Sequence, residues 1–270
     1  TYPGLPTFMK QLLDWYGIPK SNVLLCNSAL KVENLYCAPQ QEQLVDVPPT
    51  EDYVRILSSH SRMRDDYPVD SGKNIFVSRA GLVRGSIAGE AYLESFFRTN
   101  RFIVLRPEEH TLREQLTLYA NANMIVFTEG SSLHALQLLG HLCCKVLVIA
   151  RRPKRRFSRN ILSTRVSSLH YIDHIRTFVP GLTSNGQPIA LNKLLHGSRG
   201  WQYSGITVLN AQEFLSALDS HEINTSSWNP SEFDLHVAAD ISRWLEFQLR
   251  NGSFSINEKE KICANLFTLK

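Results

Sequence analysis

The stretch MIVFTEGSSLHALQLLG, residues 124–140, is the part of the chain that decides the fold. Its first four apolar residues predict a buried strand, and the apolar spacing from Ser132 to Gly140 predicts a helix. An acid, a glycine and two serines lie between the two elements. Glycine permits a tight turn and the close approach of a ligand, and a serine can cap the helix. The junction is therefore interpreted as a strand end that opens into a binding loop.

Residues 73–150 repeat the same alternation on both sides of this stretch. Thr111 and Glu114 form a T-x-x-E capping box at the start of one helix. We expect strands at 73–78, 101–106, 123–128 and 145–150, and helices at 90–99, 112–122 and 132–140. Near-continuous apolar strands that alternate with helices predict a parallel sheet covered on both faces. Right-handed crossovers would make this α/β fold doubly wound.

The flanking parts of the chain show other patterns. We expect a helix at 8–18, short strands at 22–27 and 31–39, and a helix within 45–72 after two prolines. Residues 205–219 predict one more strand and a helix capped by Asn210. The segment 229–250 predicts an amphipathic helix capped near Ser231. We divide the chain into residues 1–70, 71–225 and 226–270.

The composition is that of a globular protein: 43% of the 270 residues are hydrophobic and 20% are charged. The chain has no run of eighteen apolar residues and no signal-peptide pattern at its start. The five cysteines are odd in number and lack metal-type spacing, which favours free thiols in a reducing compartment. The net charge of +4 suits either a phosphate-bearing ligand or an anionic membrane face.

Three segments are expected at the carboxyl ends of the strands, where doubly wound sheets bind ligands: the one that begins at Ser78, residues 106–109 and residues 128–134. Arg79 and Arg84 lie beside glycines after the first strand, and arginine matches phosphate oxygens bidentately. The helix start after Gly130 suits a phosphate as well. Glu129 and His134 would then act on a ligand bound there. The alternatives are a plain capped turn and a solvated loop.

The run RRPKRRFSR, residues 151–159, follows the strand at 145–150. It fits a solvated loop, a contact with anionic lipid or a polyanionic substrate, or a nucleic-acid contact. Its single aromatic residue, Phe157, weakens the case for single-stranded nucleic acid. His170 and His174 have the spacing of a metal pair but lack an evident third ligand, so we favour a structural role. Gln115 is interpreted as a surface or helix-packing residue.

The order of these segments resembles glycosyltransferase family 61, most closely its bacterial branch of capsular polysaccharide biosynthesis proteins. The resemblance is strongest over residues 73–150. The matching residues are Ser78, Arg79, Pro107, Glu108, Glu114, Gln115, Glu129, Gly130, Ser131, Ser132 and His134.

The resemblance implies a GT-B-like architecture with two α/β lobes. Residues 71–225 would be the C-terminal lobe that binds the nucleotide-sugar, and residues 1–70 the tail of the N-terminal, acceptor-side lobe. Residues 226–270 would be a C-terminal helical segment. A chain without the rest of the N-terminal lobe would bind a donor poorly or would not turn over. The resemblance also implies inverting transfer with no obligatory metal and no cofactor other than the donor, for which a UDP-type nucleotide is favoured.

The expected site follows from this resemblance. Arg79 and Arg84 would clamp the diphosphate, and the base would be Glu129, His134 or a group of the missing lobe. The expected donor-binding set is Ser78, Arg79, Arg84, Glu108, Gly130, Ser131 and Ser132.

The resemblance also implies transfer of a hexosyl or pentosyl group to a glycan or lipid-linked glycan of capsule or lipopolysaccharide. The enzyme would be cytoplasmic, peripheral at the inner membrane. Arg151, Arg152, Arg155 and Arg156 would contact anionic headgroups there, and no specific nucleic acid is expected. The rival interpretations are a non-catalytic scaffold of the same fold, a nucleic-acid-binding α/β protein and an enzyme acting on another phosphorylated substrate.

Overall fold

A computed structural model describes residues 4–42, 47–62, 72–83, 85–152, 156, 158–179 and 205–250. Its centre is a five-stranded sheet in the order β2-β1-β3-β4-β5, in which every neighbouring pair is parallel. Its strands are β1 (Lys73–Val77), β2 (Ile103–Leu105), β3 (Ala122–Thr128), β4 (Leu142–Ile149) and β5 (Val166–Ile172). The predicted parallel α/β sheet is confirmed.

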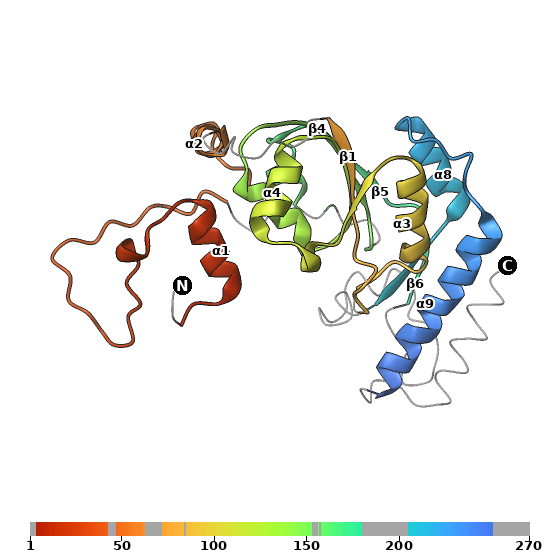
Figure 1. The fold of residues 1–270 in the computed structure, drawn as a ribbon, viewed down its shortest axis with the longest axis horizontal. Coiled ribbons are helices and arrows are strands. Elements are labelled where there is room, and N and C mark those ends of the chain that lie inside the picture. Colours follow the sequence, from red (N-terminus) through yellow and green to blue (C-terminus); the bar gives the residue numbers. More distant parts are fainter. Residues whose placement is uncertain are drawn as a thin grey trace.

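Helices cover both faces of this sheet, as Figure 1 shows. One face carries α1 (Thr7–Trp15), α4 (Leu112–Ala120) and the 3₁₀ helix η3 (Ser131–Leu138). The other carries α3 (Glu90–Thr99), α8 (Ala211–Ser220) and α9 (Pro230–Arg250). Side chains of β1 alternate between the faces, since Ile75 and Val77 belong to one core cluster and Phe76 to the other.

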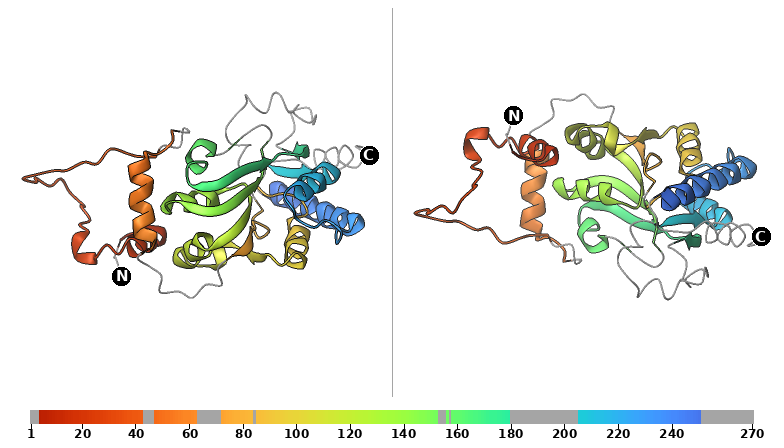
Figure 2. Two further views of the ribbon diagram at one scale, coloured as in Figure 1. Left: turned by 90° about the horizontal axis from the view of Figure 1, so that it is seen from above. Right: turned by 90° about the horizontal axis from the view of Figure 1, so that it is seen from below.

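The remaining elements are short or peripheral. The helix α2 (Glu51–Arg62) lies beside α1 at one end of the molecule, and α8 and α9 lie at the other (Figure 2). The strands β6 (Ile175–Val179) and β7 (Ile206–Leu209) form a separate antiparallel pair. The short helices are η1 (Lys20–Asn22), η2 (Pro107–Glu109) and α5 (Arg159–Leu162).

Several helix starts agree with the sequence. Thr111 and Glu114 form the predicted capping box, in which Thr111 Oγ1 accepts from the Glu114 N–H and the Glu114 carboxylate accepts from the Thr111 N–H. Asn210 caps α8 as predicted. The cap of α9, expected near Ser231, is Asn229, whose Oδ1 accepts the N–H of Glu232 at 3.3 Å.

The predicted strands at 22–27 and 31–39 are wrong. Both segments run as irregular chain that loops away from the sheet (Figures 1 and 2), and no strand pairs with them in the described residues. Leu24, Leu35 and Tyr36 are consequently exposed. An apolar run stays a strand only when another strand supplies its backbone partners. Within the described ranges Cys26, Cys37, Cys143 and Cys144 are free thiols, as expected.

Candidate functional site

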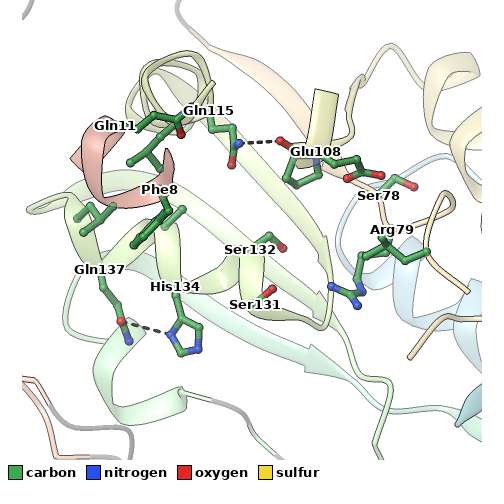
Figure 3. Close-up of a pocket in the computed structure, with 15 residues that line it drawn as sticks. Phe8, Gln11, Ser78, Arg79, Glu108, Gln115, Ser131, Ser132, His134 and Gln137 are labelled. Carbon is green, nitrogen blue, oxygen red and sulfur yellow. Dashed lines mark hydrogen bonds between the residues drawn. The ribbon is translucent and has the colours of Figure 1, made fainter. Parts of the chain in front are cut away.

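The carboxyl ends of β1, β2 and β3 meet at one edge of the sheet and line a pocket of about 600 Å³. Helix α1 and the 3₁₀ helix η3 contribute to its walls. Figure 3 shows the labelled side chains that surround it. The structure brings together six residues of the predicted site: Ser78, Arg79, Glu108, Ser131, Ser132 and His134. They come from three separate strand-to-helix connections, so the sheet edge assembles this part of the predicted site.

Arg79 extends from the end of β1 toward Ser131 and Ser132 (Figure 3). A Cβ atom built at Gly130 would overlap the Arg79 guanidinium, so the glycine makes room for this side chain. Burial lowers the pKa of Arg79, and the charges of Glu90, Glu108 and Glu129 oppose that shift. Because arginine keeps its charge in proteins, Arg79 presents a partly buried cation to the pocket.

The loop after β3 differs from the expected capped helix. The element that follows is the 3₁₀ helix η3, and its start at Gly130 has no side-chain cap, so neither Ser131 nor Ser132 caps it. Both serines line the pocket instead. The Ser132 hydroxyl oxygen is buried and has no hydrogen-bond partner among the described residues. A buried hydroxyl without a partner is costly, which favours a bound polar ligand near it.

Glu129 is completely buried and is not among the residues that line the pocket. Its carboxylate accepts the backbone N–H groups of Arg151 and Arg152 at 2.8 and 3.0 Å. It also accepts the Arg152 Nε–H at 2.8 Å and pairs with Arg152 Nη2. This geometry joins the end of β3 to the end of β4. Glu129 therefore has the surroundings of a structural anchor rather than those of a base in contact with substrate.

The first two arginines after β4 do not lie at the surface, where the anionic contact was expected. Arg151 and Arg152 are only 4% and 6% exposed. Arg156 Nη2 lies 2.7 Å from Asp173 Oδ2, and its guanidinium carbon lies 5.6 Å from the centre of the Tyr171 ring. The expectation of an anionic surface contact is thus wrong for Arg151 and Arg152, because the first turn after the strand folds inward onto Glu129. Arg84 and Arg155 lie outside the described residues.

His134 lies in the pocket with its Nδ1 3.3 Å from Gln137 Oε1. When that amide oxygen accepts, Nδ1 carries the proton and Nε2 is the basic nitrogen of the ring. Burial lowers the pKa of His134, although the bond to Gln137 opposes the shift. A neutral imidazole near pH 7 is the form that a general base requires.

Sequence reasoning missed three polar or aromatic residues of this pocket, Phe8, Gln11 and Gln137. It included Gln115 in the matching set but gave that residue no place in the site. Gln115 Nε2 donates to the carbonyl oxygens of Pro107 and His110 at 2.8 and 3.0 Å, which holds the turn that carries Glu108. Its place in the predicted helix beside the capping Glu114 was the available signal. Phe8 gave no signal, because only the packing of α1 against α4 brings it to the pocket.

The histidines His170 and His174 belong to a different region. His170 lies on β5, so the spacing of four residues does not place the two rings on one helix face. The His170 ring lies 4.7 Å from that of His221, and His174 Nδ1 lies 3.1 Å from Glu213 Oε2. In the part of the chain that the structure describes, no three His, Cys, Asp or Glu side chains form a group that could hold a metal ion.

The fold and this pocket are those of an α/β enzyme class that places its ligand at the carboxyl edge of a parallel sheet. The family model of Glycosyltransferase 61 matches residues 5–145, more than half of the chain. The chain belongs to glycosyltransferase family 61. The matched region runs from before α1 into β4 and includes every residue that lines the pocket. The match therefore begins well before residue 73, the start of the region in which the sequence resemblance is strongest.

A search of curated proteins gave no match to this chain. None of the described helices is both long and apolar enough to span a bilayer.

Proposed function

We propose that this protein transfers a sugar from a nucleotide-sugar donor, with a UDP-type nucleotide favoured, to a hydroxyl group of a glycan or lipid-linked glycan. Membership of family 61 supports glycosyltransferase activity. The observation that carries the proposal for this site is Arg79, which points into the pocket past Gly130. The buried hydroxyl of Ser132 in the same pocket supports it further.

The proposed reaction inverts the anomeric centre and needs no metal. The acceptor oxygen attacks the anomeric carbon while the bond from that carbon to the diphosphate oxygen breaks, and the acceptor proton passes to His134 Nε2. Arg79, Ser131 and Ser132 stabilise the charge that develops on the leaving nucleoside diphosphate. Ser78 and Glu108 orient the donor from the other wall. Glu129 has no direct contact with substrate in this scheme and holds the ends of β3 and β4 together.

Several finer points remain part of the proposal. We place the reaction on the cytoplasmic side of the membrane in a bacterial pathway for capsule or lipopolysaccharide, with a hexose or pentose as the transferred sugar. We propose a GT-B arrangement in which residues 71–225 bind the donor, residues 1–70 belong to the acceptor side and residues 226–270 are a helical extension. A nucleic-acid-binding role finds less support, because Arg151 and Arg152 are buried.

Nucleotide binding tests the donor site. Thermal unfolding is measured with UDP, GDP, CMP and ADP and their sugar conjugates, on the wild type, Arg79→Ala and Arg55→Ala. A nucleotide at a hundred times its Kd should stabilise the wild type by about 2.7 kcal/mol. The Arg79→Ala protein loses a charge-assisted hydrogen bond worth about 1.5–3 kcal/mol, so it should bind the nucleotide about ten- to a hundredfold more weakly than the wild type. Arg55 is exposed on α2, so its removal should leave binding unchanged.

The same binding measurement, together with an assay of sugar transfer, distinguishes the role of His134 from that of Arg79. His134→Gln should bind the nucleotide like the wild type and lose sugar transfer about a hundredfold or more. The proposal is wrong if no nucleotide stabilises the wild type, or if Arg79→Ala binds nucleotide with full affinity. Nucleotide binding without transfer or donor hydrolysis in the wild type would favour the non-catalytic scaffold instead.

A further inference from the structure

The pocket has two ends of different chemistry (Figure 3). Arg79 and the two serines occupy one end. Phe8, Gln11 and Gln137 occupy the other, and we name these three residues the Phe8 subsite. His134 lies beside Gln137 at this second end. Among the described residues that line the pocket, the cation Arg79 and the carboxylate Glu108 both lie away from the Phe8 subsite (Figure 3).

Helix α1, which carries Phe8 and Gln11, is anchored to the rest of the fold. Trp15 at its end is 3% exposed and belongs to the core that α4 and the sheet share. Asp14 Oδ2 lies 3.1 Å from Arg113 Nη2, and the Tyr16 hydroxyl lies 3.5 Å from the Leu138 carbonyl oxygen. These contacts fix α1 against α4 and η3. Gln11 and Phe8, about one and two turns before Trp15, are therefore held at the pocket wall.

Phe8 is 56% exposed although it lines the pocket. A phenylalanine left open to solvent at a pocket wall offers a flat apolar face to a ligand. The amides of Gln11 and Gln137 each have both donor and acceptor atoms. A pyranose ring matches this combination, since it has an apolar C–H face and an edge of hydroxyl groups that donate and accept.

We propose that the Phe8 subsite binds a sugar ring of the acceptor, with the C–H face of the ring against Phe8 and its hydroxyl groups toward Gln11 and Gln137. The proposal rests on the proposed glycosyl transfer, because it assigns the second substrate of that reaction to the second end of the pocket.

Three observations favour the acceptor over the donor at this end. The donor diphosphate needs the cation at the Arg79 end. A glycan acceptor is longer than the pocket and must leave it, and the exposed face of Phe8 marks an end that is open to solvent. His134, bonded to Gln137, is also the base that the acceptor hydroxyl has to reach. Residues of α1 would thus choose the acceptor, whereas the ends of β1 and β3 hold the donor.

Saturation-transfer NMR with simple sugars tests this inference. The probes are the methyl glycosides of glucose, galactose, mannose and N-acetylglucosamine, titrated with and without UDP. The variants are Phe8→Ala, Phe8→Trp and the control Met9→Ala, a residue that is also exposed on α1 but does not line the pocket. We expect one pyranoside to bind the wild type, Phe8→Trp and Met9→Ala alike. The Phe8→Ala protein lacks the ring that the bound sugar would cover, so it should bind the pyranoside about tenfold or more weakly than the wild type. Its Kd for UDP should change less than about twofold.

The outcomes separate the two proposals. Equal pyranoside binding by Phe8→Ala and the wild type overturns the inference, as does the absence of binding by the wild type. A loss of UDP affinity in Phe8→Ala also overturns it, because it would place the nucleotide at this end. In each of these cases the proposed function is still supported if the wild type binds UDP and Arg79→Ala does not. Conversely, pyranoside binding that depends on Phe8 without any nucleotide binding supports the subsite and rejects the proposed donor site.

Discussion

The neighbours of Glu129 show how the surroundings of one side chain change its expected role. An acid after a strand, beside glycine and two serines, is typical of an active-site loop, and on that ground Glu129 is a candidate base. In the structure its two oxygens face two backbone N–H groups and the guanidinium of Arg152. Those donors come from the next strand end, 22 and 23 residues away.

Glu129→Gln should destabilise the protein strongly. The substitution removes the negative charge that balances Arg152, which is 6% exposed, and the loss of one partner of a buried pair costs about 3–5 kcal/mol. Urea denaturation measures the change. Asp52→Asn is the matched control, because Asp52 and its partner Arg55 are both largely exposed and such pairs contribute little. A Glu129→Gln protein with wild-type stability but no transfer activity would instead restore Glu129 as a catalytic residue.

At the scale of elements, nearby residues determine where some helices begin and end, whereas other elements depend on partners that are distant in the chain. The boundaries of α3 and α4 follow from apolar spacing and from the capping box, which need only nearby residues. Residues 23–42 are irregular because no neighbouring strand among the described residues pairs with them, and no local sequence pattern can supply such a partner. Glu90, the buried first residue of α3, also depends on a partner outside its own helix. Glu90 Oε1 accepts the Arg79 N–H at 2.6 Å, so α3 is tied to the loop that carries the pocket arginine.

Glu90 predicts a pH dependence of stability. Burial is the main cause that raises the pKa of Glu90 from 4.5 to about 7. The folded protein therefore holds this proton more tightly than the unfolded chain, so the contribution of Glu90 to stability is complete below pH 4.5 and is lost as the pH rises through 7. Glu90→Gln cannot lose a proton, and its stability relative to the wild type should rise over this window.

The measurement is the free energy of unfolding of wild type and Glu90→Gln between pH 4.5 and 8. The difference should grow by at most about 1.4 kcal/mol per pH unit and level off above pH 7. The Arg79 N–H, which donates to the Glu90 carboxylate, and the charge of Arg79 both lower this pKa and narrow the pH window. A difference that does not vary with pH would contradict the predicted titration of Glu90.

At the scale of the whole molecule, the front of the chain is part of one core with the sheet. Trp15 packs in the cluster that contains Leu116, Tyr119 and Phe127. Further along, Glu42 pairs with the completely buried Arg165. A Cβ built at Gly140 would overlap the backbone of Ser58 on α2, so the glycine permits close packing of that helix. These contacts join residues before 70 to the domain that follows them.

Trp15→Ala should lower the stability of the whole protein rather than release α1 alone. Truncation of a buried tryptophan costs about 3–5 kcal/mol, and a shared core unfolds in one transition. Circular dichroism and intrinsic fluorescence during urea denaturation should give coincident curves with a lower midpoint. Met9→Ala on the same helix should shift the midpoint little, because Met9 is partly exposed. An early separate transition in Trp15→Ala would show that the front segment unfolds independently.

The sequence alone determined the parallel α/β sheet, the helix at 90–99, the helix expected at 112–122, which ends two residues earlier, and the three connections that line the pocket. It did so because apolar periodicity, capping residues and glycines act over a few neighbouring residues, and because parallel strands end at a common edge. Only the tertiary structure decided that Glu129 and Arg152 form a buried pair and that Phe8 joins the pocket. Both depend on contacts between residues far apart in the chain, 23 residues for the pair and about seventy or more for Phe8 and the strand ends. Local sequence patterns do not specify contacts between such distant residues, because these contacts form only when whole elements pack together.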